Sequence, residues 1–415
     1  MPYPTILFLA ALGLGLILEL WLLQRHRAHI LMHRERVPDA FANRVSPEEH
    51  RKAADYSGAK IALHRIDLLI SALVLLAWTL GGGIERLNAP WAATPWGELA
   101  AGIGLIISFS LINGLIGLPS QIYQTFVIEE RFGFNRTTPA RFIKDLLLQT
   151  LLGLLLGIPL LGAILWLMGA AGTYWWLAAW GVWIAFMLFI SWIFPTVLAP
   201  LFNKFTPLEQ GPLRERVEGL LERCGFASKG IFVMDGSRRS GHGNAYFTGF
   251  GRNKRIVFYD TLIESLDGDE VEAVLAHELG HFKKRHVLKG LLSAAAITLA
   301  GLWVLGWLST EAWFYQSLGV SEASNAAALL LFMLAAPVFT QFFQPLGAWY
   351  SRRHEFEADE FAVRVADAEP LISALVKMYR ENASTLTPDP LYSAFHDSHP
   401  PAPVRIAHLS STISR

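Results

Sequence analysis

Residues 267–281 read DGDEVEAVLAHELGH, and this stretch decides what the carboxyl-terminal half of the chain is built around. Asp267 with Glu270 three residues later is a helix-capping pattern, and apolar residues at helical spacing follow it. We therefore expect a helix that runs through His277 and His281. These two histidines lie four residues apart, so their side chains share one helix face.

His277 and His281 enclose Glu278 in an H-E-x-x-H motif. Both imidazoles can reach one zinc ion at about 2.0–2.1 Å, and the carboxylate can take a proton from the water that zinc activates. The other interpretation is a helical histidine pair that binds no metal. The capped helix around the motif favours zinc catalysis, with one Zn2+ per chain.

Composition indicates a membrane protein. Hydrophobic residues make up 53% and charged residues 17% of the 415 residues, and the mean hydropathy is +0.35. One soluble domain would need more polar surface than this. Nearly uncharged runs, each about long enough to cross a bilayer, predict seven spans: 4–23, 66–84, 99–118, 146–169, 174–200, 287–309 and 325–349.

The basic residues predict the orientation, because short cytoplasmic loops are enriched in Lys and Arg. The connection 85–98 contains a single basic residue, Arg86. We expect the amino terminus outside the membrane, and the carboxyl terminus and active site in the cytoplasm. The first span has no basic n-region and is interpreted as a retained anchor. The basic residues concentrate on the cytoplasmic side, in 24–65, 119–145, 201–286 and the tail from 350.

The predicted fold is mainly α: a polytopic membrane protein with about seven transmembrane helices plus a small cytoplasmic α+β zinc metalloprotease domain. We divide it into a membrane domain with five spans (1–204) and a zinc metallopeptidase domain with two more (205–415). The single cysteine, Cys224, is expected to pack rather than react. The patterns around it predict a helix at 214–224, strands at 231–234, 245–250 and 255–259, and a hairpin turn at 251–254.

A catalytic zinc needs a third protein ligand, and Glu355 is the best candidate. The spans 287–309 and 325–349 form a hairpin that returns the chain to the level of the two histidines. Asp359 shares the helix face of Glu355 and can accept the free N–H of a ligating histidine. Glu357 is expected at the surface, and His354 is a weaker metal candidate. Alternatively, these acids form a solvated helix start.

Charged and aromatic residues alternate in 129–136, within the connection 119–145. This pattern suits a segment that docks onto the protein. It suits a charged interfacial loop equally well.

Taken together, the motifs resemble the type I CAAX prenyl endopeptidases, which are polytopic zinc metalloproteases with seven spans. The resemblance covers nearly the whole chain. It implies that His277, His281 and Glu355 bind zinc, that Glu278 is the base and that Asp359 supports the site. It rests on VIEERFGFN at 127–135, Asn244-Ala245-Tyr246, the motif at 277–281, SRRHEFEAD at 351–359, and His399-Pro400-Pro401 followed by Arg405.

The resemblance implies further roles. Asn244 and Tyr246 would belong to an edge strand to which a peptide substrate adds. His399 and Arg405 would lie near the scissile carbonyl or the substrate terminus, and the seven helices would enclose a large chamber. From the sequence alone, His399 is equally a turn residue before two prolines.

The function expected from these patterns is that of a membrane-embedded zinc metalloendopeptidase resembling proteases that cleave CAAX-type prenylated peptides. Its partners would be a peptide or protein substrate, lipidated or membrane-bound, and the lipid bilayer, with no nucleic acid. A composition rich in Leu, Ala, Trp and Arg suits a bacterial inner-membrane protein, where prenylated substrates are not expected.

Two alternatives remain open. One is a quality-control zinc protease that cuts non-prenylated membrane proteins. The other is a zinc-binding transporter or receptor without hydrolysis. The near absence of ionisable residues from the predicted spans disfavours a transporter, and a transporter has no need of Glu278 beside a ligand.

Overall fold

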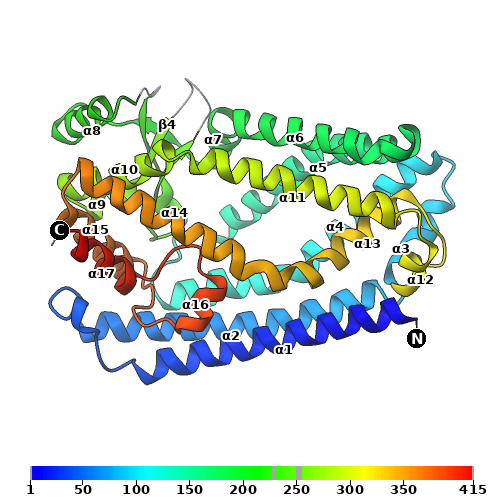
Figure 1. The fold of residues 1–415 in the computed structure, drawn as a ribbon, viewed down its shortest axis with the longest axis horizontal. Coiled ribbons are helices and arrows are strands. Elements are labelled where there is room, and N and C mark those ends of the chain that lie inside the picture. Colours follow the sequence, from blue (N-terminus) through cyan, green and yellow to red (C-terminus); the bar gives the residue numbers. More distant parts are fainter. Residues whose placement is uncertain (1, 227–229, 249–254, 414–415) are drawn as a thin grey trace.

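Long membrane-type helices dominate the computed structural model, which describes residues 2–226, 230–248 and 255–413. Seven helical segments are long and apolar enough to cross a membrane, as the sequence predicts. The two chain ends lie at opposite ends of the molecule (Figure 1). The first six spans are built on α1 (Tyr3–Met32), α2 (Pro47–Trp78), α4 (Gly97–Tyr123), α5 (Pro139–Ala170), α6 (Trp175–Ile193) and α11 (His286–Leu308).

The seventh span carries the chain directly into the predicted site. Helix α13 (Asn325–Thr340) continues through the short 3-10 turn η6 (Gln341–Phe343) into α14 (Gln344–Val365). The residues around Glu355 therefore lie in the middle of a helix and do not start one. This rules out the alternative of a solvated helix start.

Several helices extend well beyond their apolar runs. The connection predicted at 24–65 is mostly helical, because α1 ends only at Met32 and α2 starts at Pro47. A capping box starts α2: Ser46 and Glu49 each bind the backbone N–H of the other. Short helices also occupy the connections at the opposite end of the molecule, α3 (Gly83–Ala92) and α12 (Ala312–Ser317).

The connection 119–145 docks onto the protein. Helix α4 continues into a π-helical segment, η2 (Gln124–Glu129), before the chain turns. Phe132 and Phe134 are buried, and their rings lie 5.2 Å and 5.0 Å from the ring of Tyr56 on α2. The aromatic residues therefore fix this connection against α2, as the docking interpretation predicts.

A small four-stranded sheet lies at the end of the molecule that holds the carboxyl terminus. Its strand order is β1-β2-β4-β3, so β3 is an edge strand. The pair β2–β4 is parallel, and the pairs β1–β2 and β3–β4 are antiparallel. The predicted hairpin turn at 251–254 lies outside the described residues. The strands are β1 (Phe205–Pro207), β2 (Ile231–Met234), β3 (Ala245–Thr248) and β4 (Arg255–Tyr259).

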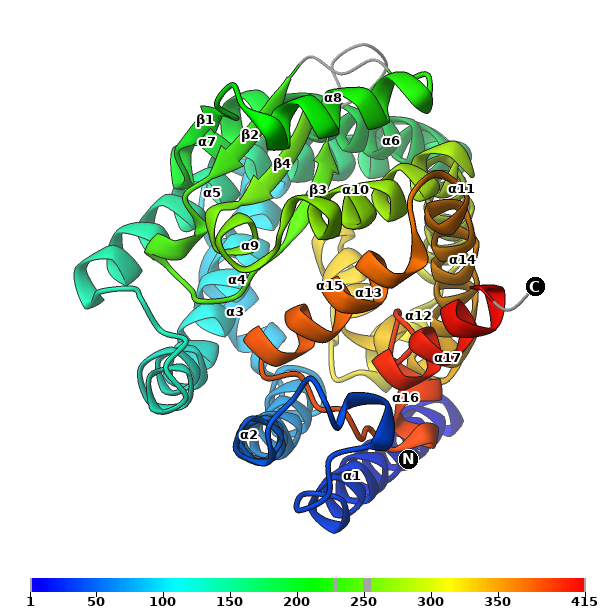
Figure 2. The same ribbon diagram turned by 90° about the vertical axis from the view of Figure 1, so that its left-hand side faces the viewer.

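Helix α10 (Gly268–Lys283) packs against this sheet, and together they form the main soluble core (Figure 2). Asp267 and Glu270 form the predicted capping box at its start. Cys224 is a free thiol buried in the same core, as expected for a packing residue. The other helices at this end are α7 (Ala199–Phe202), α8 (Pro212–Arg223), α9 (Asp260–Ser265), α15 (Ala368–Glu381), α16 (Pro390–His396) and α17 (Ala402–Ile413).

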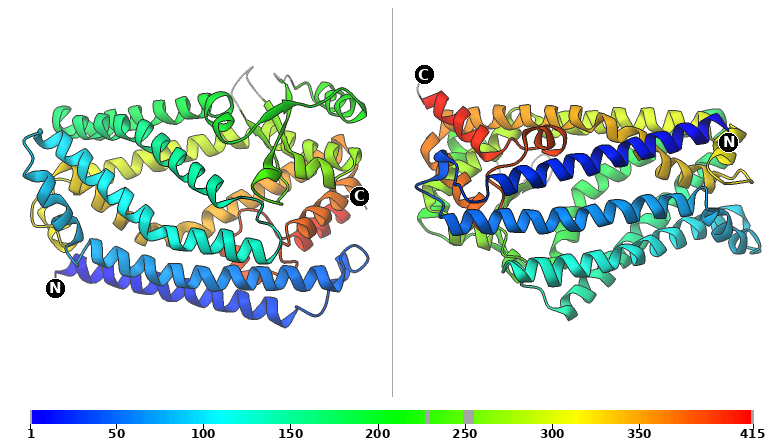
Figure 3. Two further views of the ribbon diagram at one scale, coloured as in Figure 1. Left: turned by 180° about the vertical axis from the view of Figure 1, so that it is seen from behind. Right: turned by 90° about the horizontal axis from the view of Figure 1, so that it is seen from below.

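The amino-terminal helices join this end of the molecule through contacts that are distant in sequence. Helices α1 and α2 run side by side along the molecule (Figure 3), and α1 also contacts α16. The Arg25 guanidinium on α1 binds the buried carboxylate of Asp389, with Nε 2.9 Å from Oδ2. The membrane helices therefore help to build the environment of the carboxyl-terminal segment.

Candidate metal centre

The candidate site forms where α10 crosses α14. Gly280 sits at the crossing, and a Cβ at this position would come within 2.9 Å of the backbone of Ala358. Only a glycine lets the two helices approach this closely. The crossing places Glu355 opposite the two histidines of α10, as the hairpin of the last two spans predicts.

Three side chains could hold a metal ion there. His277, His281 and Glu355 offer donor atoms that all lie within 4.8 Å of one another. The histidine Nε2 atoms are 3.2 Å apart, and they lie 3.5 Å and 3.2 Å from the Glu355 carboxylate oxygens. His277 and Glu355 are buried. The geometry therefore brings together the three residues predicted as ligands.

Hydrogen bonds behind the first histidine leave its inward nitrogen free for a metal. The Nδ1–H of His277 donates to Asp359 Oδ1 at 2.8 Å, so Nε2 keeps its lone pair. Burial lowers the pKa of His277, but its hydrogen bonds to Asp359 and Glu355 outweigh burial and raise this pKa to about 9. In its neutral form His277 therefore offers the Nε2 lone pair to a metal ion, and in the metal-free site a proton takes this place.

A second chain of hydrogen bonds lies behind His281. Its Nδ1 is 3.1 Å from Nδ1 of His286, whose Nε2 is 3.1 Å from Glu357 Oε2. If Glu357 accepts from His286 Nε2–H, then His286 Nδ1 accepts from His281 Nδ1–H, and His281 Nε2 keeps its lone pair. Two acceptor nitrogens then face each other 3.2 Å apart, which a cation between them stabilises.

The Glu355 carboxylate also indicates that a cation binds here. Its Oε2 atom is buried and has no hydrogen-bond partner among the described residues. A buried carboxylate oxygen without a partner is costly unless a cation satisfies it. Two imidazole nitrogens and one carboxylate also form a donor set that zinc binds in catalytic sites. The residues present therefore fit a zinc ion.

Glu278 and His399 lie beside the cluster but outside the ligand set. Burial raises the pKa of the Glu278 carboxyl, and Glu355 raises it further, whereas the two histidines lower it. His399 places Nε2 3.4 Å from Glu355 Oε1, and its side chain is 64% exposed. His399 is thus accessible to a bound substrate.

Arg405 is tied to the acidic residues behind the metal cluster. Its side chain is buried, and both its Nε and a terminal nitrogen bind the carboxylate of Asp359. Another terminal nitrogen lies 3.7 Å from Glu355 Oε2. Because these buried acids hold the guanidinium, Arg405 supports Asp359 in this structure, and its predicted contact with substrate stays a prediction.

Glu357, which the sequence predicts at the surface, is only partly exposed. Its side chain is only 28% exposed and binds His286, so it is not a plain surface residue. His286 is the residue that sequence reasoning missed. It begins α11 directly after Arg285, whose left-handed backbone (φ 57°) turns the chain back toward His281. His354 stacks on His286, with ring centroids 4.0 Å apart, and is not in the ligand set.

Asn244 and Tyr246 lie at the predicted edge strand. Asn244 precedes β3, and its side-chain oxygen accepts the backbone N–H of Ala245. Side chains alternate along a strand, so Tyr246 points to the opposite sheet face from Ala245 and packs against Tyr259. The structure therefore does not bring the Tyr246 side chain into the metal cluster.

Comparisons with known proteins agree with the fold and show the family. The family model "CAAX prenyl protease N-terminal, five membrane helices" matches residues 26–204, and the model "Peptidase family M48" matches residues 207–413. A membrane-embedded peptidase is the class that these matches define. The chain belongs to peptidase family M48, in its CAAX prenyl protease branch.

Individual relatives match over almost the full chain. A CAAX prenyl protease 1 homolog of Oryza sativa is 35% identical over 94% of this chain and 93% of its own length. CAAX prenyl protease 1 of Saccharomyces cerevisiae is 31% identical over 92% and 90%. The crystal structure of S. mikatae Ste24p superposes with a TM-score of 0.91 at 28% identity and covers 99% of both chains. These relatives are eukaryotic and give no support to the expected bacterial origin.

Proposed function

We propose that this chain is a zinc endopeptidase that cleaves CAAX-type prenylated peptides or proteins at the membrane. The observation that carries the proposal is the cluster of His277, His281 and Glu355, whose free donor atoms converge within 4.8 Å. The CAAX prenyl protease relatives support the substrate class. The chain would consist of a membrane domain (1–204) and a metallopeptidase domain (205–415).

The three ligands would hold one zinc ion, which when bound polarises water and the scissile carbonyl. Glu278 accepts a proton from the attacking water and returns it to the leaving amine. The raised pKa of its carboxyl suits this exchange, because an efficient general base has a pKa nearer to neutrality than an exposed glutamate. His399 stands on the exposed side, where an N–H can stabilise the developing oxyanion.

A peptide would reach these groups along β3. An edge strand leaves backbone N–H and C=O groups free, and an extended peptide can pair with them. Asn244 stands where such a peptide would enter or leave the strand. Asp359 and Arg405 would act indirectly, by holding His277.

The substitution Glu278→Gln tests the reaction. It keeps the side-chain shape and removes the basic oxygen, so zinc content and folding should persist while peptide turnover falls by about 10²–10⁴-fold. Glu272→Gln on the same helix, where the carboxylate binds surface Arg223, should leave turnover unchanged. Retention of more than about a tenth of wild-type kcat in Glu278→Gln would contradict the assigned base.

We also propose that the amino terminus is extracytoplasmic and that the site faces the cytoplasm. The distribution of Lys and Arg among the connections supports this orientation. Reporter tags at positions 90 and 316 should be extracytoplasmic, and tags at 40 and 410 cytoplasmic. The reverse pattern would place the active site on the other side of the membrane.

A further inference from the structure

His399 lies in a short link, 397–401, between α16 and α17. Its Nε2 atom is 3.4 Å from Glu355 Oε1, and its Nδ1 atom is 2.9 Å from the hydroxyl of Ser398, although the side chain is 64% exposed. An exposed side chain on a link keeps several rotamers unless its backbone and neighbours restrict it. A group that stabilises an oxyanion has to be held in place before the reaction. We therefore looked for what fixes this link.

Arg352 on α14 binds the end of α16. The last carbonyl groups of a helix have no partner within the helix, and a cation near them is favourable. One terminal nitrogen of Arg352 lies 3.2 Å from the carbonyl oxygen of Ser393 and 2.7 Å from that of Asp397. The other terminal nitrogen lies 3.1 Å from the carbonyl oxygen of Ala394. The planar guanidinium therefore holds three backbone acceptors just before His399.

Helix α14 holds both flanks of the link. Arg352 precedes Glu355 by three residues, and Asp359 follows Glu355 by four, so the three side chains lie on one helix face. Asp359 binds Arg405, which belongs to α17. Successive turns of α14 thus bind the end of α16, contribute a predicted metal ligand and bind α17. The position of His399 relative to Glu355 is therefore set by a single helix.

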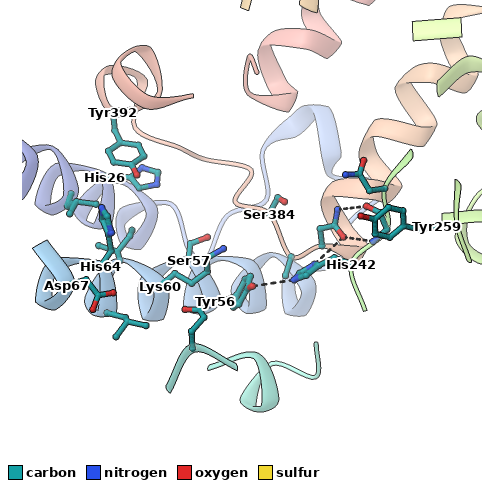
Figure 4. A pocket seen from close by; sticks show the side chains of 18 residues that line it. His26, Tyr56, Ser57, Lys60, His64, Asp67, His242, Tyr259, Ser384 and Tyr392 are labelled. Atoms are coloured by element: carbon teal, nitrogen blue, oxygen red, sulfur yellow. Dashed lines mark hydrogen bonds between the residues drawn. The ribbon is translucent and has the colours of Figure 1, made fainter. Parts of the chain in front are cut away.

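Helix α1 holds α16 from the other side. The ring of His26 stacks on that of Tyr392, with centroids 4.0 Å apart (Figure 4). Both residues line a polar cavity of about 800 Å³ between α1, α2 and the segment after α15. Arg25 binds Asp389 at the start of the same helix. Because α16 is fixed at its start by α1 and at its end by α14, its last turn has a defined place beside the metal cluster.

We propose that Arg352 is a positioning residue that holds the end of α16 so that His399 keeps its place beside the metal cluster. The inference rests on the proposed function, because it acts through the oxyanion role of His399. Arg352 itself contacts neither the donor atoms of the metal cluster nor β3. Its loss should therefore lower kcat, while KM and zinc content change little.

The first test is kinetic. Arg352→Met removes the guanidinium and keeps most of the side-chain stem. We expect kcat to fall by about 10²-fold, as for a misplaced catalytic group, at a nearly unchanged KM. Arg352→Lys keeps a cation at the helix end but lacks the planar fork, so it should lose less. The control is Arg364→Met on the same helix, where the side chain is 69% exposed and kcat should not change.

A double-mutant cycle separates positioning from a general structural role. His399→Ala should lower kcat by about 10²–10³-fold, as expected for one oxyanion donor. If Arg352 acts through His399, adding Arg352→Met to His399→Ala should cause little further loss. Equal losses in both backgrounds would overturn the proposal, and so would a normal kcat in Arg352→Met or in His399→Ala. If Arg352→Met does not fold, as judged by its size-exclusion profile and zinc content, Arg352→Lys replaces it in the cycle.

A second readout requires no cleavage. Cys224 is the single cysteine and is buried, so a Cys224→Ala, Ser398→Cys protein accepts one nitroxide label beside His399. Its electron paramagnetic resonance spectrum should show an immobilised label in this parent protein. Arg352→Met should make the label mobile, and Arg364→Met should not. An unchanged spectrum in Arg352→Met would contradict the proposal.

Failure of the proposed function has a different signature. If the wild-type chain cleaves no peptide while Arg352→Met still makes the label mobile, the peptidase assignment fails and the positioning by Arg352 stands. If the wild-type chain cleaves peptide and Arg352→Met changes neither kcat nor the spectrum, the peptidase assignment stands and the positioning fails.

Discussion

The two histidines of the metal cluster are held in different ways. Behind His277 stand Asp359, which is fully buried, and the buried Arg405. Behind His281 stands His286, whose own partner Glu357 is 28% exposed. One support is an ion pair in a dry interior, and the other is an imidazole backed by a carboxylate near solvent. We conclude that the first side couples metal binding to folding, whereas the second mainly tunes one ligand.

The largest effect on zinc binding is expected for Glu355, which contacts both histidines. Glu355→Ala removes the shared third ligand and leaves two imidazoles, so the purified variant should lose both bound zinc and peptide turnover. Glu360→Ala on the same helix should keep both, because that carboxylate lies near Arg364 at the surface. The zinc content of both purified variants is measured after their size-exclusion profiles have been shown to match that of the wild type. Stoichiometric zinc with normal turnover in Glu355→Ala would remove this residue from the site.

A smaller effect on metal binding, with a loss of stability, is expected on the buried side. Asp359→Ala frees His277 and leaves the buried Arg405 guanidinium with only the Glu355 carboxylate, 3.7 Å away. Zinc affinity should fall by about 10–100-fold, and the free energy of unfolding by about 3–5 kcal/mol. Competition with a chelator and thermal unfolding in detergent measure the two quantities. Adding Arg405→Met should recover stability without recovering affinity, and a stability unchanged in Asp359→Ala would contradict the buried ion pair.

The smallest effect on zinc binding is expected for His286, which stands behind His281. His286→Ala removes the acceptor behind His281, so zinc affinity should fall by about tenfold, the low end of such effects. Stability should change little, because Glu357 keeps Lys289 and Arg353 nearby. His354→Phe preserves the ring that stacks on His286 and serves as the control. Equal zinc affinity in His286→Ala and wild type would show that this histidine does not support the site.

The sequence predicted those parts of the site that depend on local rules. Asp267 and Glu270 are three residues apart and form the capping box of α10. The i, i+4 spacing alone places His277 beside His281 on one helix face. Hydropathy predicted all seven spans, because burial in lipid requires long apolar runs. The same spans predicted that Glu355 returns to the histidines.

The rest of the site depends on geometry that no local pattern carries. His286 faces His281 only because the left-handed residue Arg285 turns the chain between two helices. Arg405 reaches Asp359 across 46 positions, since α17 packs on α14. The polar cavity between α1, α2 and the segment after α15 forms only where these distant parts of the chain meet.

Removal and return of the metal tests the central claim most directly. The claim is that His277, His281 and Glu355 hold one catalytic zinc ion per chain. Chelator treatment of the purified wild-type protein should abolish peptide cleavage, and one equivalent of zinc should restore it, while Glu355→Ala recovers nothing. Peptide cleavage that persists at the wild-type rate in protein shown to be free of metal would contradict the account.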